Sequence, residues 1–171
     1  AALFLEQYPS FFEKAVLSAP MMKLNFGAVP EWQGKFLALW SGIVRWNTKF
    51  VPGQHGFDGK YEFEDSSCMS RARYDYAFCQ RKETPEYTTS GGTYAWSRAS
   101  LRAMKKIARN ARKVRIPVLL FQAGRDALVR PEGQQYFANH TPNTRIIRYE
   151  NSKHEIFNAD QAIREAYYRE I

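Results

Sequence analysis

The stretch that decides the fold reads IPVLLFQAGRD and covers residues 116–126. Its apolar run is short and stops at Gly124, as expected for a buried strand that ends in a sharp turn. The turn places the carboxylate of Asp126 at the end of that strand. Asp126 is therefore a candidate orienting acid. In the simpler interpretation it is a turn aspartate that bonds to nearby backbone N–H groups.

A second strand-like run, TRIIRY at residues 144–149, is followed by a polar loop and then by His154. Imidazole suits proton transfer because its unperturbed pKa of about 6.5 permits exchange near neutrality. His154 is therefore the candidate base, and the alternative is a histidine in a surface loop. An acid after one strand and a histidine after the next form the second half of an order in which a serine comes first, on a Gly-x-Ser-x-Gly turn. No such pentapeptide occurs in the 171 residues.

Helical and strand-like segments alternate on either side of a central insertion. Before it, we expect a helix at the start of the chain and a strand over 14–19, stopped by Pro20. After it, we expect a helix capped by Ser97 or Ser100, a helix over 131–139, and a last helix that follows a capping box of Asn158 and Gln161.

This order of elements predicts an α/β fold. Parallel strand pairs need helical crossovers, so the sheet should be mostly parallel with helices on both faces. The expected core comprises residues 1–20 and 97–171, and the expected insertion comprises residues 21–96. Ligands in such sheets bind at the carboxyl ends of the strands, where both Asp126 and His154 are expected.

The insertion is rich in aromatic residues and glycine and is interpreted as a mainly helical lid. Large apolar side chains recur in it at helical intervals. They are Trp32, Phe36, Leu39, Trp40, Ile43 and Val44, with Leu37 and Trp46 widening the stripe. The stripe either packs on the main domain or forms an acyl-chain wall or a membrane-facing surface.

The composition gives the chain a formal net charge of +8, from 25 basic and 17 acidic residues, which favours anionic partners. The basic residues cluster in the stretch KKIARNARKVR at 105–115, whose apolar members keep helical spacing. The stretch is interpreted as the solvated face of a packed helix, with anionic membrane surface and then nucleic acid as alternative partners. Cys68 and Cys79 are too few for a disulfide framework and are interpreted as ordinary thiols.

Several segments together resemble a known family. Residues 1–9 and 15–21 are similar to the helix and strand that follow the nucleophile in α/β-hydrolases of the bacterial lysophospholipase and monoacylglycerol lipase group. Residues 70–74 and 91–96 resemble lid segments of its lysophospholipase branch. The resemblance extends to residues 124–126 and 153–158, and so touches nearly the whole chain.

The resemblance implies an α/β-hydrolase fold and the hydrolysis of a lipid ester, a lysophospholipid or a monoacylglycerol. It also implies that the nucleophilic serine and the oxyanion donors precede Ala1, so that the chain would be the C-terminal part of a hydrolase of about 300 residues. No metal or organic cofactor is expected, peripheral contact with anionic membrane is expected, and nucleic acid is not.

Within this scheme Asp126 and His154 are the expected catalytic residues. Tyr94 and Trp96, after a double glycine at the exit from the lid, are candidate substrate contacts or ordinary packing residues. The other two histidines are rejected as bases. His55 lies in a glycine-rich loop, and His140 is expected at the end of its helix away from the strand tips.

Overall fold

The computed structural model describes all of residues 1–171, and the chain divides into two compact units. The first unit contains residues 1–25, 67–70 and 103–171, and the second contains residues 26–66 and 71–102. Four residues from the middle of the insertion, Ser67–Ser70, therefore belong to the first unit. No helix of the structure has both the length and the apolar character needed to cross a membrane.

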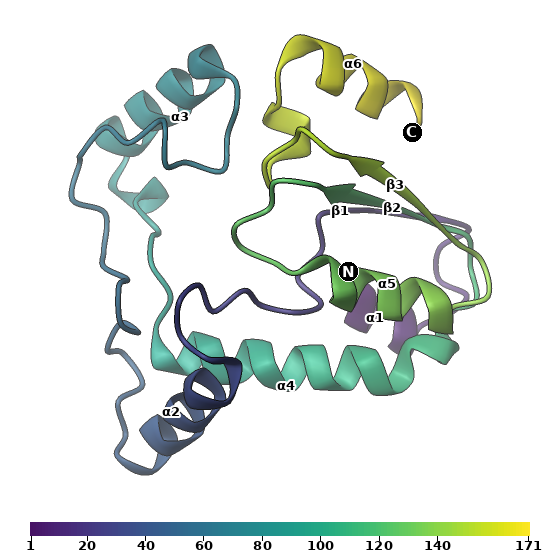
Figure 1. The fold of residues 1–171 in the computed structure, drawn as a ribbon, viewed down its shortest axis with the longest axis horizontal. Coiled ribbons are helices and arrows are strands. Elements are labelled where there is room, and N and C mark those ends of the chain that lie inside the picture. Colours follow the sequence, from purple (N-terminus) through teal and green to yellow (C-terminus); the bar gives the residue numbers. More distant parts are fainter. The chain divides into compact units, whose positions relative to one another are not determined.

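A three-stranded parallel sheet lies at the centre of the first unit (Figure 1). Its strands are β1 (Ala15–Ser18), β2 (Val118–Ala123) and β3 (Thr144–Tyr149), in the order β1-β2-β3. Val118 is opposite Ala15 on one side and Thr144 on the other. All three strands therefore end at the same edge of the sheet, as the sequence predicts.

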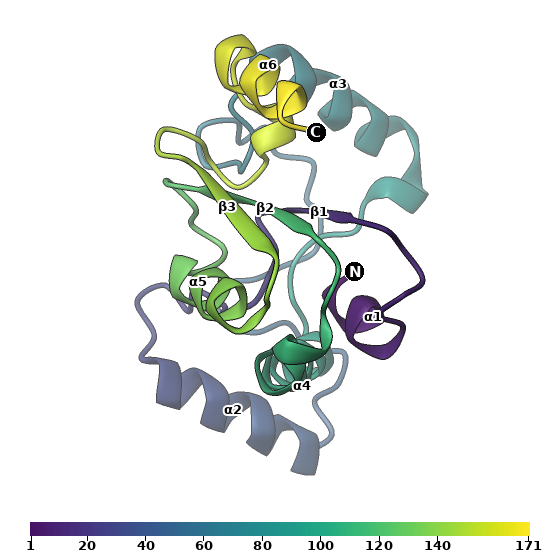
Figure 2. The same ribbon diagram turned by 90° about the vertical axis from the view of Figure 1, so that its right-hand side faces the viewer.

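Helices cover both faces of this sheet (Figure 2). On one face lie α1 (Ala2–Gln7), α5 (Pro131–His140) and the end of α4 (Tyr94–Asn110), with the 3-10 turn η2 (Ala111–Lys113). On the other lie η3 (Ile156–Asn158) and α6 (Gln161–Arg169). The predicted α/β fold is confirmed in this unit.

The central strand supplies the core on both sides, because successive side chains of a strand point to opposite faces. Leu120 packs with the cluster that includes Leu5, Ile107 and Phe137, whereas its neighbour Phe121 packs with the cluster that includes Tyr167. The two strand residues are completely buried. Burial on both faces explains why the run at 116–121 is continuously apolar rather than alternating.

The second unit is mainly helical. It contains α2 (Glu31–Ile43), α3 (Arg71–Glu83), the 3-10 turn η1 (Pro85–Tyr87) and the beginning of α4. The guanidinium of Arg98 on α4 donates to the buried hydroxyl of Ser41 on α2 at 2.7 Å. That bond joins two helices that are far apart in the sequence.

Two predicted helix caps are wrong. Ser97 and Ser100 lie inside α4, which begins earlier, and the hydroxyl of Thr93 accepts from the N–H of Trp96 at 3.3 Å. The last helix is capped by Asp160, whose carboxylate accepts from the N–H of Ile163 at 3.0 Å. Both errors arise because several residues near each start have capping side chains, and only the backbone path selects one.

The large apolar side chains of α2 are exposed. Trp32, Phe36 and Ile43 expose 68%, 63% and 71% of their surface, and Phe36 and Trp40 stack with their ring centroids 6.4 Å apart. The stripe is therefore not buried within the second unit, and its role as a binding surface stays a prediction.

Candidate active site

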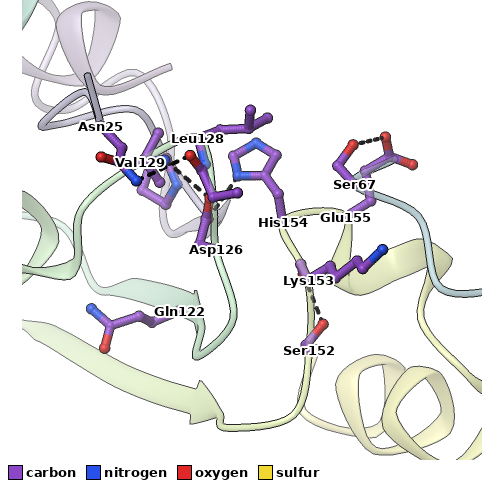
Figure 3. Close-up of polar contacts among 12 residues, drawn as sticks. Asn25, Ser67, Gln122, Asp126, Leu128, Val129, Ser152, Lys153, His154 and Glu155 are labelled. Carbon is purple, nitrogen blue, oxygen red and sulfur yellow. Dashed lines mark hydrogen bonds and ion pairs between the residues drawn. The ribbon is translucent and has the colours of Figure 1, made fainter. Parts of the chain in front are cut away.

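Asp126 lies in the loop between β2 and α5. One carboxylate oxygen, Oδ1, accepts from the N–H of Leu128 at 2.9 Å and from that of Val129 at 3.0 Å. These bonds are those of a turn aspartate, so the simpler interpretation of Asp126 is correct for Oδ1 but does not account for Oδ2. The second oxygen, Oδ2, faces the histidine loop (Figure 3).

Gly124 allows this loop to run next to the one that follows β3. A Cβ atom at this position would lie 2.2 Å from the backbone oxygen of Glu150. The chain turns at Gly124 and Arg125, as the sequence suggested, and the glycine in addition allows a close approach of two backbones. The N–H of Gly124 donates to the carbonyl of Tyr149 at 2.9 Å across the same gap.

The segment after β1 holds the other side of the Asp126 loop. The Asn25 side chain donates to the carbonyl of Ala127 at 3.2 Å, and its backbone N–H donates to the carbonyl of Leu128 at 3.0 Å. The N–H of Arg130 donates to the carbonyl of Lys23 at 2.8 Å. Sequence reasoning missed these partners, because residues a hundred positions away show no local pattern that links them.

His154 lies in the loop between β3 and η3. The loop is anchored to the Asp126 loop by the carbonyl of Ser152, which accepts from the N–H of Arg125 at 2.9 Å. Ser152 is completely buried, and its own N–H donates to the carbonyl of Tyr149 at 3.1 Å. Backbone hydrogen bonds thus join the loops that follow β2 and β3, independently of the contact between the side chains of Asp126 and His154.

The predicted meeting of Asp126 and His154 is confirmed. Nδ1 of His154 lies 2.7 Å from Oδ2 of Asp126. The aspartate side chain is 4% exposed and the histidine side chain 26% exposed. With its proton on Nδ1, the imidazole donates to the carboxylate and keeps Nε2 as an acceptor. The pair therefore has a buried anion behind a base that solvent or substrate can reach.

Hydrogen bonds keep Asp126 ionised. Burial raises the pKa of this carboxyl, but the hydrogen bond from His154 and those from the backbone N–H groups of Val129 and Leu128 together outweigh it. The pKa of Asp126 is therefore lowered from its ordinary value. An ionised carboxylate at this distance favours a protonated Nδ1 and would stabilise a positive charge on the ring.

A buried amide pair lies beneath the site. Gln122 on β2 donates to Oε1 of Gln134 on α5 at 2.9 Å, and Gln134 donates to the carbonyl of Pro20 at 3.2 Å. Arg148 on β3 donates to Oε1 of Gln122 at 3.1 Å. The network links all three strand ends to α5. A glutamine within the apolar run at 118–123 was the sequence signal for it.

The two rejected histidines lie elsewhere. Nδ1 of His55 is 2.7 Å from the carbonyl of its neighbour Gly56. His140 is the last residue of α5, stacks on Tyr136 and bonds to the carbonyl of that residue at 2.8 Å. It precedes the start of β3, at the opposite end of the strands from Asp126 and His154.

Tyr94 and Trp96 both lie in the first turn of α4, within the second unit. Tyr94 is buried, with its ring centroid 5.9 Å from that of Trp46, which accounts for it as a packing residue. Trp96 is 49% exposed and so could contact a ligand. Substrate contact by either residue stays a prediction.

The basic stretch at 105–115 has the expected arrangement. Lys105, Lys106, Arg109, Arg112 and Lys113 are exposed, whereas Met104, Ile107, Ala111 and Val114 are buried. It is therefore the solvated face of a packed helix and the turn that follows. Cys68 is buried and Cys79 exposed, and both are free thiols. The structure contains no group of three or more His, Cys, Asp or Glu side chains that could hold a metal ion.

Comparison with known proteins gives consistent matches. The chain is 22% identical over 158 residues to a probable lysophospholipase L2 of Haemophilus influenzae, covering 91% of this chain and 49% of that protein. It therefore spans about half the length of this curated relative.

Solved structures with similar folds include two lipases. A monoacylglycerol lipase of Paleococcus ferrophilus aligns with a TM-score of 0.68 and 19% identity, over 99% of this chain and 60% of that chain. A monoglyceride lipase of Saccharomyces cerevisiae aligns with a TM-score of 0.62 and 13% identity, over 91% of this chain and 52% of that one. The model of the serine aminopeptidase S33 family matches residues 1–161. The chain therefore belongs to this family, and its fold is that of an α/β-hydrolase.

Proposed function

We propose that this chain carries the acid and the base of a serine hydrolase that cleaves carboxylic esters of lipids, and that the enzyme is a lysophospholipase or a monoacylglycerol lipase. The supporting observation is the bond of 2.7 Å between Nδ1 of His154 and Oδ2 of Asp126 at the carboxyl ends of two neighbouring parallel strands. The lipid substrate is supported by the relatives described above, whose names are those of lipid esterases.

In the proposed mechanism, Nε2 of His154 accepts the proton of a serine hydroxyl as the serine oxygen attacks the ester carbonyl. The same imidazole then donates that proton to the leaving alcohol, so that the acyl group stays on the serine until water removes it. Asp126 keeps the proton on Nδ1 and stabilises the transient imidazolium without accepting the proton. This division of roles suits a buried carboxylate behind a partly exposed ring.

The nucleophilic serine is proposed to lie before Ala1 in the complete enzyme, because no Gly-x-Ser-x-Gly occurs within residues 1–171. The chain alone is accordingly expected to be inactive. A fluorophosphonate probe should label the complete enzyme at a serine that precedes Ala1. A stable adduct on a serine within residues 1–171 would overturn this assignment.

His154→Ala in the complete enzyme tests the proposed base. We expect kcat for hydrolysis of a lysophospholipid or a monoacylglycerol to fall at least about a hundredfold, since a positioned general base contributes roughly that much or more. The matched control is His140→Ala, which removes a histidine that bonds to its own helix. Undiminished hydrolysis by His154→Ala, or an equal loss in both variants, would exclude the mechanism.

A further proposal concerns the membrane. The exposed aromatic and aliphatic groups of α2 and the positive net charge suit peripheral contact with an anionic lipid surface, where such an enzyme would meet its substrate. A non-catalytic module that binds nucleic acid through the basic stretch is the competing function. Binding to anionic vesicles and to duplex DNA, compared over a range of salt concentrations, separates the two.

A further inference from the structure

The segment Ser67–Ser70, here named the strap, comes from the middle of the insertion but packs within the unit that contains Asp126 and His154. Cys68, at its centre, is 4% exposed, and its thiol bonds to the carbonyl of Asn158 at 3.4 Å. The strap is therefore a built part of the core unit.

The backbone on both sides of His154 is bonded to the strap. The N–H of Lys153 donates to Sδ of Met69 at 3.3 Å, and the N–H of Glu155 donates to the carbonyl of Ser67 at 3.2 Å. The candidate base thus lies between two residues whose amides are held by the same segment. Displacing the strap would free the backbone on both sides of His154. The position of that backbone determines where the imidazole lies.

A side-chain bridge reinforces these bonds (Figure 3). The two carboxylate oxygens of Glu155 accept from different donors: Oε1 from the hydroxyl of Ser67 at 2.6 Å, and Oε2 from the side-chain amide of Asn158 at 2.8 Å. Both oxygens of the residue after His154 are therefore engaged, and one of them is engaged by the strap.

The 3-10 turn η3, which follows the histidine loop, is bonded to the strap as well. The carbonyl of Asn158 accepts from the N–H of Met69 at 3.2 Å and from that of Ser70 at 3.1 Å. The sequence predicted that Asn158 caps the last helix. Instead, Asn158 bonds to Glu155 through its side chain and to the strap through its carbonyl, and Glu155 also bonds to the strap. Ile156, in the same turn, is completely buried and packs in the core cluster that includes Phe121.

We propose that the strap positions the base of the hydrolase, and that Ser67, Glu155 and Asn158 are positioning residues for His154. This inference rests on the proposed function for its catalytic consequence. The side chain of His154 has one anchor, Asp126, and its ring must present Nε2 to a serine from elsewhere. A misplacement of about 1 Å in such a geometry can cost on the order of a hundredfold in rate.

Paired substitutions separate positioning from general stability. Ser67→Ala and Glu155→Ala remove the bridge. Ser67→Thr keeps a hydroxyl that can form the bridge. Glu155→Gln also keeps the bridge, because the glutamine amide can donate to the Ser67 oxygen while the glutamine carbonyl accepts from Asn158. The matched control is Ser66→Ala, one residue away, whose hydroxyl donates to the carbonyl of Phe63 at 2.7 Å.

The first measurement is made on the complete enzyme and needs no turnover. Proton NMR should show the Nδ1–H of His154 as a downfield resonance, because that proton is held by Asp126. In Ser67→Ala and Glu155→Ala we expect this resonance to broaden through faster exchange with water, and the amide of Glu155 to exchange faster. Ser67→Thr, Glu155→Gln and Ser66→Ala should resemble the unchanged chain.

The second measurement uses the complete enzyme. We expect Ser67→Ala and Glu155→Ala to lower kcat roughly tenfold to a hundredfold with KM changed less than about threefold, and the conservative variants to restore most of it. An unchanged resonance and unchanged kcat in Ser67→Ala, or an equal loss in Ser66→Ala, would overturn the proposal. If the enzyme hydrolyses no lipid ester but the NMR effects occur, the function fails and the strap's positioning role stands.

Discussion

The carboxylate of Asp126 shows how one side chain fixes both a loop and a base. Oδ1 caps the turn through two backbone N–H groups, and Oδ2 holds His154. The first set of bonds makes the second possible, because a carboxylate that is anchored by its own turn loses little further freedom when it orients the ring. The lowered pKa of Asp126 follows from both sets of bonds acting against burial.

Asp126→Asn tests the charge on this carboxyl. Its pKa is lowered in the folded chain, whereas an aspartate in an unfolded chain has a pKa of about 3.9. The stabilisation by the ionised form is therefore fully present above about pH 4 and is lost as the pH falls through the lowered folded value. We expect the parent to have the higher free energy of unfolding at neutral pH, and the difference from Asp126→Asn to shrink below about pH 4.

Denaturant titrations at several pH values, followed by tryptophan fluorescence, measure this difference. A gap that stays constant from about pH 7 to pH 3 would show that ionisation of Asp126 does not stabilise the fold. In the complete enzyme the same variant should lower kcat by up to about ten-thousandfold, because an asparagine amide facing Nδ1 favours the wrong tautomer of His154.

At the scale of elements, the site depends on the register of parallel strands. The pairing of Ala123 with Tyr149 brings β2 and β3 to a common end, and both candidate catalytic loops start there. The sequence predicted these strands and their loops because apolar runs with punctuating residues are local signals. The prediction from sequence misplaced two helix caps, because the residue that caps a helix is selected by the backbone path and not only by which capping side chains lie near the helix start.

Gly124→Ala tests the close approach of the two loops. The added Cβ would lie 2.2 Å from the carbonyl oxygen of Glu150. The backbone of Glu150 could move away only if the end of β3 shifted with it. We expect the free energy of unfolding to fall by about 1–3 kcal/mol, the usual range for overpacking. Denaturant titration at neutral pH measures the change.

Gly56→Ala is the matched control for this prediction. Its added Cβ would have Phe50 as its nearest neighbour, at an ordinary contact distance of 3.8 Å. Its stability should stay within about 0.5 kcal/mol of the parent value. Equal stability of the two variants would show that the approach of Glu150 to Gly124 does not constrain the loops.

At the scale of the whole molecule, the charge and the exposed apolar groups are the basis of the proposed membrane contact. The net charge of +8 gives long-range attraction to anionic surfaces, and α2 offers a large area of exposed aromatic and aliphatic side chains. Charge alone would serve lipid and nucleic acid equally well. The aromatic groups of α2 favour lipid, because they can enter the interface between headgroups and acyl chains.

Vesicle binding tests this prediction. We expect the chain to sediment with vesicles containing anionic phospholipid, and less so as salt rises. Arg109→Gln with Arg112→Gln and Lys113→Gln should flatten the salt dependence, whereas Trp32→Ala with Phe36→Ala should weaken binding at every salt concentration. The control for the aromatic pair is Tyr168→Ala, which removes another exposed ring.

Nucleic acid as the partner would give a different outcome. Binding to a DNA duplex should then be tighter than binding to anionic vesicles, fall steeply with salt, and persist when Trp32 and Phe36 are replaced. That result would contradict the membrane proposal and favour the competing binding module.

The sequence by itself determined the order of elements, the parallel sheet and the meeting of Asp126 with His154. These follow from apolar periodicity, and from the rule that parallel strands end at one edge of a sheet, where a residue just after each strand must lie near its neighbour. Such information is local, and a short stretch of chain contains it.

Only the tertiary structure decided how that pair is held. The bonds of Asn25 to the Asp126 loop, the buried link between Gln122 and Gln134, and the strap on Glu155 each join segments separated by gaps in the sequence that no periodicity spans. The physical reason is that such hydrogen bonds depend on where the folded backbone brings donors and acceptors together. If the backbone followed a different path, the same residues would be ordinary surface side chains.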